Sequence, residues 1–282
     1  MPGSRPTPLI DGVPQTNQQL YRQLWVGGST AEDLELIGRA YDLMAELASG
    51  RLRASGKPFL CHLVGTAGLV ASVDGRPEIV IAALAHSAYV DGEWGDGRRG
   101  ISDRKRARLR GAIGVDAEVL VAAYTGLRWD PVGELDALDV GADLDPTRRD
   151  LILMRLANEI DDHLDLAMCF GKDGRDPEKV AATVGLGRRL GWAELADKLA
   201  AEVTAADEPD APRGPLYDRR ATYLPPRSHR LRFWLQLRGL PRAVANRVGA
   251  GRAIQSVDAR RSARSRSRAA GTLDGSGPRS SR

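Results

Sequence analysis

The stretch "FLCHLVGTAGLVASVDGRPEIVIAALAHSAYVD", residues 59–91, decides the fold of this 282-residue chain. It holds two apolar runs of helical length, separated by the turn residues Asp74 and Gly75. The second run is apolar on nearly every side, which predicts a buried helix over about residues 76–90 with Pro77 at its start. Each run carries one histidine, His62 and His86. Two such histidines are either metal ligands or ordinary residues of a helical core.

Helical patterns continue on both sides of this stretch, and no segment alternates with period two for long. We therefore predict an all-α domain over residues 16–205. Its further helices are expected at about 16–28, 29–50, 102–114, 116–129 and 145–171, with two short ones in 177–205 separated by Gly-Leu-Gly. Residues 91–100 and 130–144 are expected to be loops, and residues 1–15, with four prolines, a flexible arm.

The C-terminal part differs in composition from the rest. We predict a proline-rich linker at 206–227, a basic amphipathic segment at 228–248 and a disordered Arg/Ser-rich tail at 249–282. From Arg213 onward the chain has 17 arginines and three aspartates, a net charge of +14, whereas the preceding 212 residues hold 24 basic and 34 acidic side chains, a net charge of −10. Such a tail could bind an acidic partner or an anionic membrane surface. No specific nucleic-acid-binding motif is present.

Composition excludes several classes of protein. No apolar run reaches the roughly 18 residues of a membrane span, and the N-terminus has no apolar stretch of signal-peptide length. Cys61 and Cys169 are the only cysteines, too few for a disulfide framework or a four-cysteine zinc site. We therefore expect a cytoplasmic protein, which could bind a membrane peripherally through its tail.

Four segments resemble the hydrolase domain of the bacterial alarmone (ppGpp) synthetase/hydrolases, which belong to the HD superfamily of metal-dependent phosphohydrolases. They are "GRLRASGKPFLCH" (50–62), "IVIAALAHSAYVD" (79–91), "IGVDAEVLVAAYTGL" (113–127) and "LILMRLANEIDDHLDL" (151–166). The resemblance covers about residues 35–170 and includes no synthetase domain. It implies an all-helical HD-type domain.

The family's metal ligands are a histidine, a later His-Asp pair and a distant aspartate. The resemblance places them at His62, His86, Ser87 and Asn158, so two of the expected carboxylates are absent. The family's Glu before Asp91 is Val90. A hydroxyl and an amide oxygen supply no negative charge and hold a hard divalent cation more weakly than carboxylates do. An efficient ppGpp hydrolase is therefore not expected.

A shifted metal site is conceivable, because Asn158, Asp161, Asp162 and Asp165 share one helical stripe. Equally, such a stripe can be a solvated helix face. The candidate site residues are His62, His86, Asp162 and Asn158 as ligands of Mn, Fe or a similar divalent metal, Asp91 and Asp161 as catalytic groups, and Arg53 and Ser55 at the substrate.

Two functions of different class follow. The first is a phosphohydrolase acting on a nucleotide or another small phosphorylated molecule through a degenerate or shifted metal site. The second is a non-catalytic HD-like module that binds a ligand or a partner. The loop "DGEWGDGRRG" (91–100) could take part in either, with Trp94 as a stacking face for a ligand or as an anchor of the loop.

Overall fold

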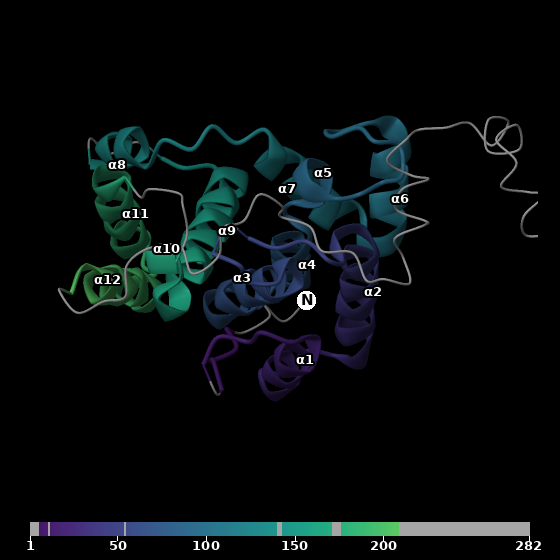
Figure 1. Cartoon of the computed structure of the whole chain (residues 1–282), viewed down its shortest axis with the longest axis horizontal. Helices are drawn as coiled ribbons and strands as arrows, with labels where there is room; N and C mark the ends of the chain where they lie inside the picture. Colours follow the sequence, from purple (N-terminus) through teal and green to yellow (C-terminus); the bar gives the residue numbers. More distant parts are fainter. Residues whose placement is uncertain (1–5, 11, 54, 140–142, 171–175, 209–282) are drawn as a thin grey trace, which may run out of the picture. The chain divides into compact units, whose positions relative to one another are not determined.

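The computed structural model describes residues 6–10, 12–53, 55–139, 143–170 and 176–208 (Figure 1). Of these, 72% are helical and none lies in a strand, which confirms the all-α prediction. No helix among them is long and apolar enough to cross a membrane. The predictions for residues 209–282, which include most of the linker, the amphipathic segment and the tail, lie outside the described residues.

The elements follow one another with short connections. They are α1 (Asn17–Val26), α2 (Ala31–Ala48), α3 (Phe59–Val73), α4 (Pro77–Ala85), α5 (Ala88–Asp91), α6 (Asp103–Ile113), α7 (Val115–Thr125), α8 (Pro131–Asp139), α9 (Pro146–His163), the 3-10 turn η1 (Leu164–Leu166), α10 (Ala167–Phe170), α11 (Pro177–Arg189) and α12 (Ala193–Asp207).

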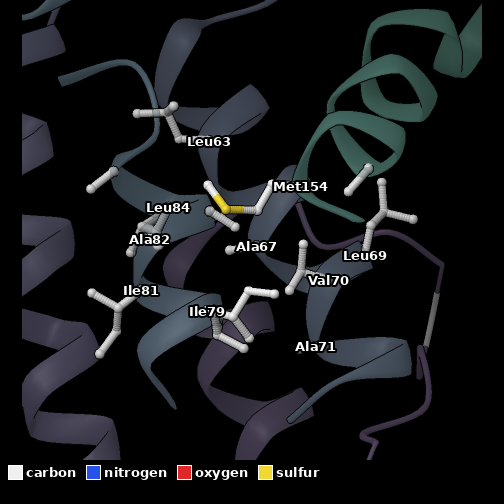
Figure 2. Packing of buried hydrophobic residues seen from close by; sticks show 14 of the residues in the cluster. Leu63, Ala67, Leu69, Val70, Ala71, Ile79, Ile81, Ala82, Leu84 and Met154 are labelled. Atoms are coloured by element: carbon white, nitrogen blue, oxygen red, sulfur yellow. The ribbon is translucent and has the colours of Figure 1, made fainter. Parts of the chain in front are cut away.

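The core forms around α3 and α4, as their all-round apolar character predicts. Helix α3 packs against α4 and α9, and α4 packs against α2 and α7. Figure 2 shows Met154 from α9 among the side chains of α3 and α4, and Leu63, Ala67 and Leu84 beside it are fully buried. This packing fixes α3 against α9, the two helices that carry most of the candidate site.

Local sequence signals set most helix starts. Thr16 and Thr30 each form a capping box with the side chain three residues later, Gln19 and Asp33 respectively. Pro77, Pro146 and Pro177 occupy first helical positions, where the missing N–H costs nothing.

Two helices that were expected to be continuous are broken. The helix expected over 145–171 ends at His163, because Asp165 and Leu166 take left-handed backbone angles with φ of 57° and 58°. The helix expected to continue from Pro77 to residue 90 ends at Ala85, and the chain resumes as α5. The second break matters for the site, since it falls at His86 and Ser87.

Two further expectations were wrong. Residues 130–144 were expected to be a loop, but α8 lies within them and Leu135 packs against Gly185 of α11. The Gly-Leu-Gly expected to separate two helices lies inside α11 instead. A Cβ at Gly187 would lie 3.0 Å from Cδ2 of Leu156, so this glycine lets α11 approach α9 closely. In both places, packing between α8, α9, α11 and α12 outweighs the local glycine signal.

Candidate functional site

A histidine of α3 meets three polar side chains of α9 at the centre of the candidate site. The His62 ring is fully buried, and its Nδ1 lies 2.8 Å from Oδ2 of Asp161 and 3.6 Å from Oδ1 of Asp162. Its Nε2 lies 2.9 Å from the amide Nδ2 of Asn158. The three residues of α9 are spaced by three and four positions, so this part of the predicted stripe faces His62, whereas Asp165 lies beyond the end of α9.

These contacts define the protonation state of His62. A carboxylate can only accept a hydrogen bond, so Nδ1 carries the proton and donates it to Asp161. Nε2 is then unprotonated and accepts from the Asn158 amide. Burial lowers the pKa of His62 to about 3, against the opposing effect of Asp162, so the ring is neutral at physiological pH.

Each of the two carboxylates has its own cation from the segment before α3. The Lys57 Nζ lies 2.6 Å from Oδ1 of Asp161, which is fully buried. The Arg53 guanidinium bonds both carboxylate oxygens of Asp162, with a distance of 2.9 Å from Nε to Oδ1. Burial raises the pKa of Asp161, and Lys57 opposes that rise. Lys57 had no role in our sequence-based prediction.

His86 lies beside His62 at the break between α4 and α5. The two ring centroids are 5.3 Å apart in an edge-to-face arrangement. The His86 Nδ1 donates to the carbonyl oxygen of Ala83 at 2.7 Å, and burial lowers its pKa to about 3. Ser87 follows with a buried hydroxyl that has no hydrogen-bond partner within the described residues. His62 and His86 are therefore neighbours, as predicted.

Arg155 and Tyr124 extend the cluster, and sequence reasoning missed both. Arg155 donates from Nη1 to Oδ1 of Asn158 at 3.0 Å and pairs with Glu159 on the same helix. The Tyr124 ring packs edge-on against His86, with centroids 5.2 Å apart. Arg155 therefore fixes the orientation of the Asn158 amide, because the oxygen faces the guanidinium and the nitrogen faces His62.

Other predicted site residues stand apart from this contact network. Within the described residues, Ser55 accepts one long hydrogen bond, from the Lys57 backbone at 3.5 Å. Asp91 ends α5, and no contact between it and His62 or His86 is found in the described part of the chain. Asp165 is exposed in the left-handed turn after α9. Trp94 anchors its loop by donating from Nε1 to the Ala88 carbonyl at 2.9 Å.

The donor set does not suit a hydrolytic metal centre. In the described residues no group of three or more His, Cys, Asp and Glu side chains is placed to hold an ion. The lone pair of His62 Nε2, which a metal would need, accepts a hydrogen bond from Asn158. Lys57 and Arg53 already neutralise the two carboxylates that a divalent cation would use. The predicted ligands are thus brought together, but they bond to side chains and to one another.

Gly65, one turn after His62, provides the space for this arrangement. A Cβ at position 65 would lie 2.0 Å from Oδ1 of Asp161. We expect Gly65→Ala to lower the free energy of unfolding by about 1–3 kcal/mol, because α9 or the carboxylate must move. Gly111→Ala in α6 is the control, since nothing lies within 4 Å of its added methyl and alanine favours the helix. Urea denaturation measures both, and equal midpoints would contradict this prediction.

Comparison with known proteins gives little further information. A protein-family model described as a domain of unknown function (DUF6817) matches residues 43–128. The match includes His62 and His86 and stops before α9, which carries Asn158, Asp161 and Asp162. No curated protein matches the chain.

Proposed function

We propose that this chain is a non-catalytic HD-like module, in which a polar network of side chains takes the place of the metal centre of the hydrolases that it resembles. The hydrogen bond from the Asn158 amide to His62 Nε2 carries this proposal. An aspartate at this position, as in the family, would present a lone pair to Nε2 and leave that nitrogen to a cation. An amide supplies the proton itself, so His62 needs no cation.

The balance of charge supports the same proposal. A divalent ion bound by two carboxylates would be neutralised by them. Here Asp161 and Asp162 are instead balanced by Lys57 and Arg53. The two cations approach the carboxylates from residues 53–57, so the charges of Asp161 and Asp162 are balanced without an ion.

The nature of the ligand follows from the resemblance and from the residues at the edge of the site. Arg53 is partly exposed, with its guanidinium 5.7 Å from the centre of the Phe59 ring. We propose a small phosphorylated molecule or a nucleotide as the ligand, competing with Asp162 for Arg53. An acidic partner or an anionic membrane surface for residues 228–282, and a cytoplasmic location, remain proposals from the sequence.

Metal analysis with a restored variant tests the proposal. We expect the wild-type chain, purified without chelator, to contain no stoichiometric Mn, Fe, Zn or Ni by elemental mass spectrometry. Ser87→Asp/Asn158→Asp should gain Mn²⁺ binding and a Tm that rises with Mn²⁺, since a ligand at 100 times its Kd stabilises by about 2.7 kcal/mol. Adding His62→Ala to this variant should abolish the response.

The alternative is a phosphohydrolase with a shifted site. Stoichiometric metal in the wild-type chain that is lost in His62→Ala/His86→Ala would overturn our proposal in favour of that enzyme. A phosphatase screen with the bound metal would then be the next step, with Asp91 and Asp161 as the catalytic candidates.

A further inference from the structure

The segment before α1 is held against α3, although we predicted residues 1–15 as a flexible arm. Thr7 is 2% exposed, and its backbone N–H and its hydroxyl both donate to the Ala71 carbonyl, at 2.8 and 3.0 Å. Gln23 of α1 donates from Nε2 to the carbonyls of Thr7 and Gly68, at 2.9 and 3.0 Å. The described residues 6–10 and 12–15 are thus attached to two helices.

Two glycines leave the space that this segment occupies on the surface of α1 and α3. A Cβ at Gly27 would lie 1.7 Å from Cγ2 of Thr7, and one at Gly68 would lie 2.2 Å from Cγ of Pro14. Pro14 is buried on this surface. Because no side chain fits at either glycine while the segment is in place, the surface of α1 and α3 is shaped to receive it.

The far end of the segment reaches the candidate site. The Gln15 amide nitrogen lies 3.3 Å from the Cβ position of Gly65, next to Oδ1 of Asp161. A hydrogen bond from Gln15 lowers the pKa of Asp161, against the larger opposing effect of burial. Asp161 and His62 are both fully buried. Gln15 therefore lies next to the buried Asp161 carboxylate, on its Gly65 side.

We propose that residues 6–10 and 12–15 act as a strap, which closes the Asp161 side of the His62 site and opens by detaching locally while the helices stay folded. A short attachment without helix or strand has a lower local stability than the helices beneath it. Entry of water, ions or ligands to His62 from this side then depends on detachment of the strap.

The test displaces the strap in the full chain with Gly27→Ala. Gly27 has φ of −73°, which alanine adopts freely, so the substitution leaves the backbone unstrained and only fills the space beside Thr7. Two rates are measured by mass spectrometry: thermolysin cleavage within residues 6–10 and 12–15, and exchange of the His62 ring Cε1–H for deuterium, which reports access of solvent to the ring. We expect both rates to rise about tenfold or more, because the added methyl group would occupy the space of the Thr7 side chain and favour detachment of the strap. Gly111→Ala should change neither.

Two further measurements separate detachment of the strap from general loosening. Thr7→Ala removes the methyl and the hydroxyl without adding bulk, and should raise both rates in the same direction. His163, 2% exposed and distant in sequence from the strap, is the internal reference and should exchange at the wild-type rate. Faster cleavage with unchanged His62 exchange would overturn the proposal, as would a parallel rise at His163 or no change in either variant.

Discussion

Lys57→Met is expected to lower the free energy of unfolding by about 3–5 kcal/mol, the cost of leaving a buried carboxylate without its cation. Asp161 is 0% exposed and Lys57 only 15% exposed by side chain, so water cannot replace the lost ammonium group. The methionine keeps the length of the lysine stem, and the effect therefore reports the charge and not the packing. Urea denaturation at neutral pH measures it.

Two matched variants make this result specific. Arg188→Met breaks the ion pair between Arg188 and Asp197, whose side chains are 57% and 64% exposed respectively. It should lower the free energy of unfolding by less than about 1 kcal/mol. Adding Asp161→Asn to Lys57→Met should recover part of the loss, because a neutral amide still accepts from His62 and needs no cation. If Lys57→Met costs no more than Arg188→Met, Lys57 does not neutralise a buried charge at Asp161.

The helices could be predicted where a segment's own sequence shows an all-round apolar pattern or a capping box. The runs of α3 and α4 are apolar on all sides, and Thr30 with Asp33 shows where α2 begins. Helix α8 carries only a start signal in its own segment, since Pro131 is its first residue and Asp130 accepts from the Gly133 N–H. Its contact of Leu135 with Gly185 lies 50 residues later in the chain and cannot be seen in the local pattern. The break at His86 and Ser87 is equally hidden inside a helical apolar run.

The candidate site also has a part that the local sequence predicts and a part that depends on contacts distant in the chain. Helical periodicity placed Asn158, Asp161 and Asp162 on one face, and the structure puts that face against His62. Periodicity cannot show that Lys57 would pair with Asp161, since 104 residues separate them. Periodicity and the resemblance therefore predicted that His62, His86 and the α9 side chains lie together, but the pairing of Lys57 and Arg53 with the carboxylates had to come from the structure.

Stability should fall steeply in mild acid because of the two buried histidines. Burial lowers the pKa of both His62 and His86 to about 3 in the folded chain, whereas an unfolded histidine has a pKa of about 6.5. Between these pH values the histidines bind protons in the unfolded chain but not in the folded chain. The folded state therefore has its full stability above pH 6.5 and becomes less stable as pH falls toward 3. Each histidine contributes a slope of about 1.4 kcal/mol per pH unit in that window.

Asp161 acts in the opposite direction. Its pKa is raised in the folded chain, so protonation of this group favours the folded state as pH falls and offsets some of the loss. The slope is therefore taken between pH 6 and pH 5, the part of the window farthest from the ordinary aspartate pKa of about 3.9. Urea denaturation at half-unit intervals gives that slope, and a flat profile would contradict the neutral, buried state of both rings.

Two variants assign the slope to individual rings. His86→Leu removes one titrating group and should lower the slope by about 1.4 kcal/mol per pH unit, even if the variant is less stable throughout. Asn158→Asp should also flatten it, because a carboxylate beside Nε2 lets His62 hold a second proton in the folded chain and raises its pKa. An unchanged slope in Asn158→Asp would mean that residue 158 does not govern the protonation of His62. The amide would then have no part in keeping that ring neutral, and the proposed replacement of the metal centre would lose its central contact.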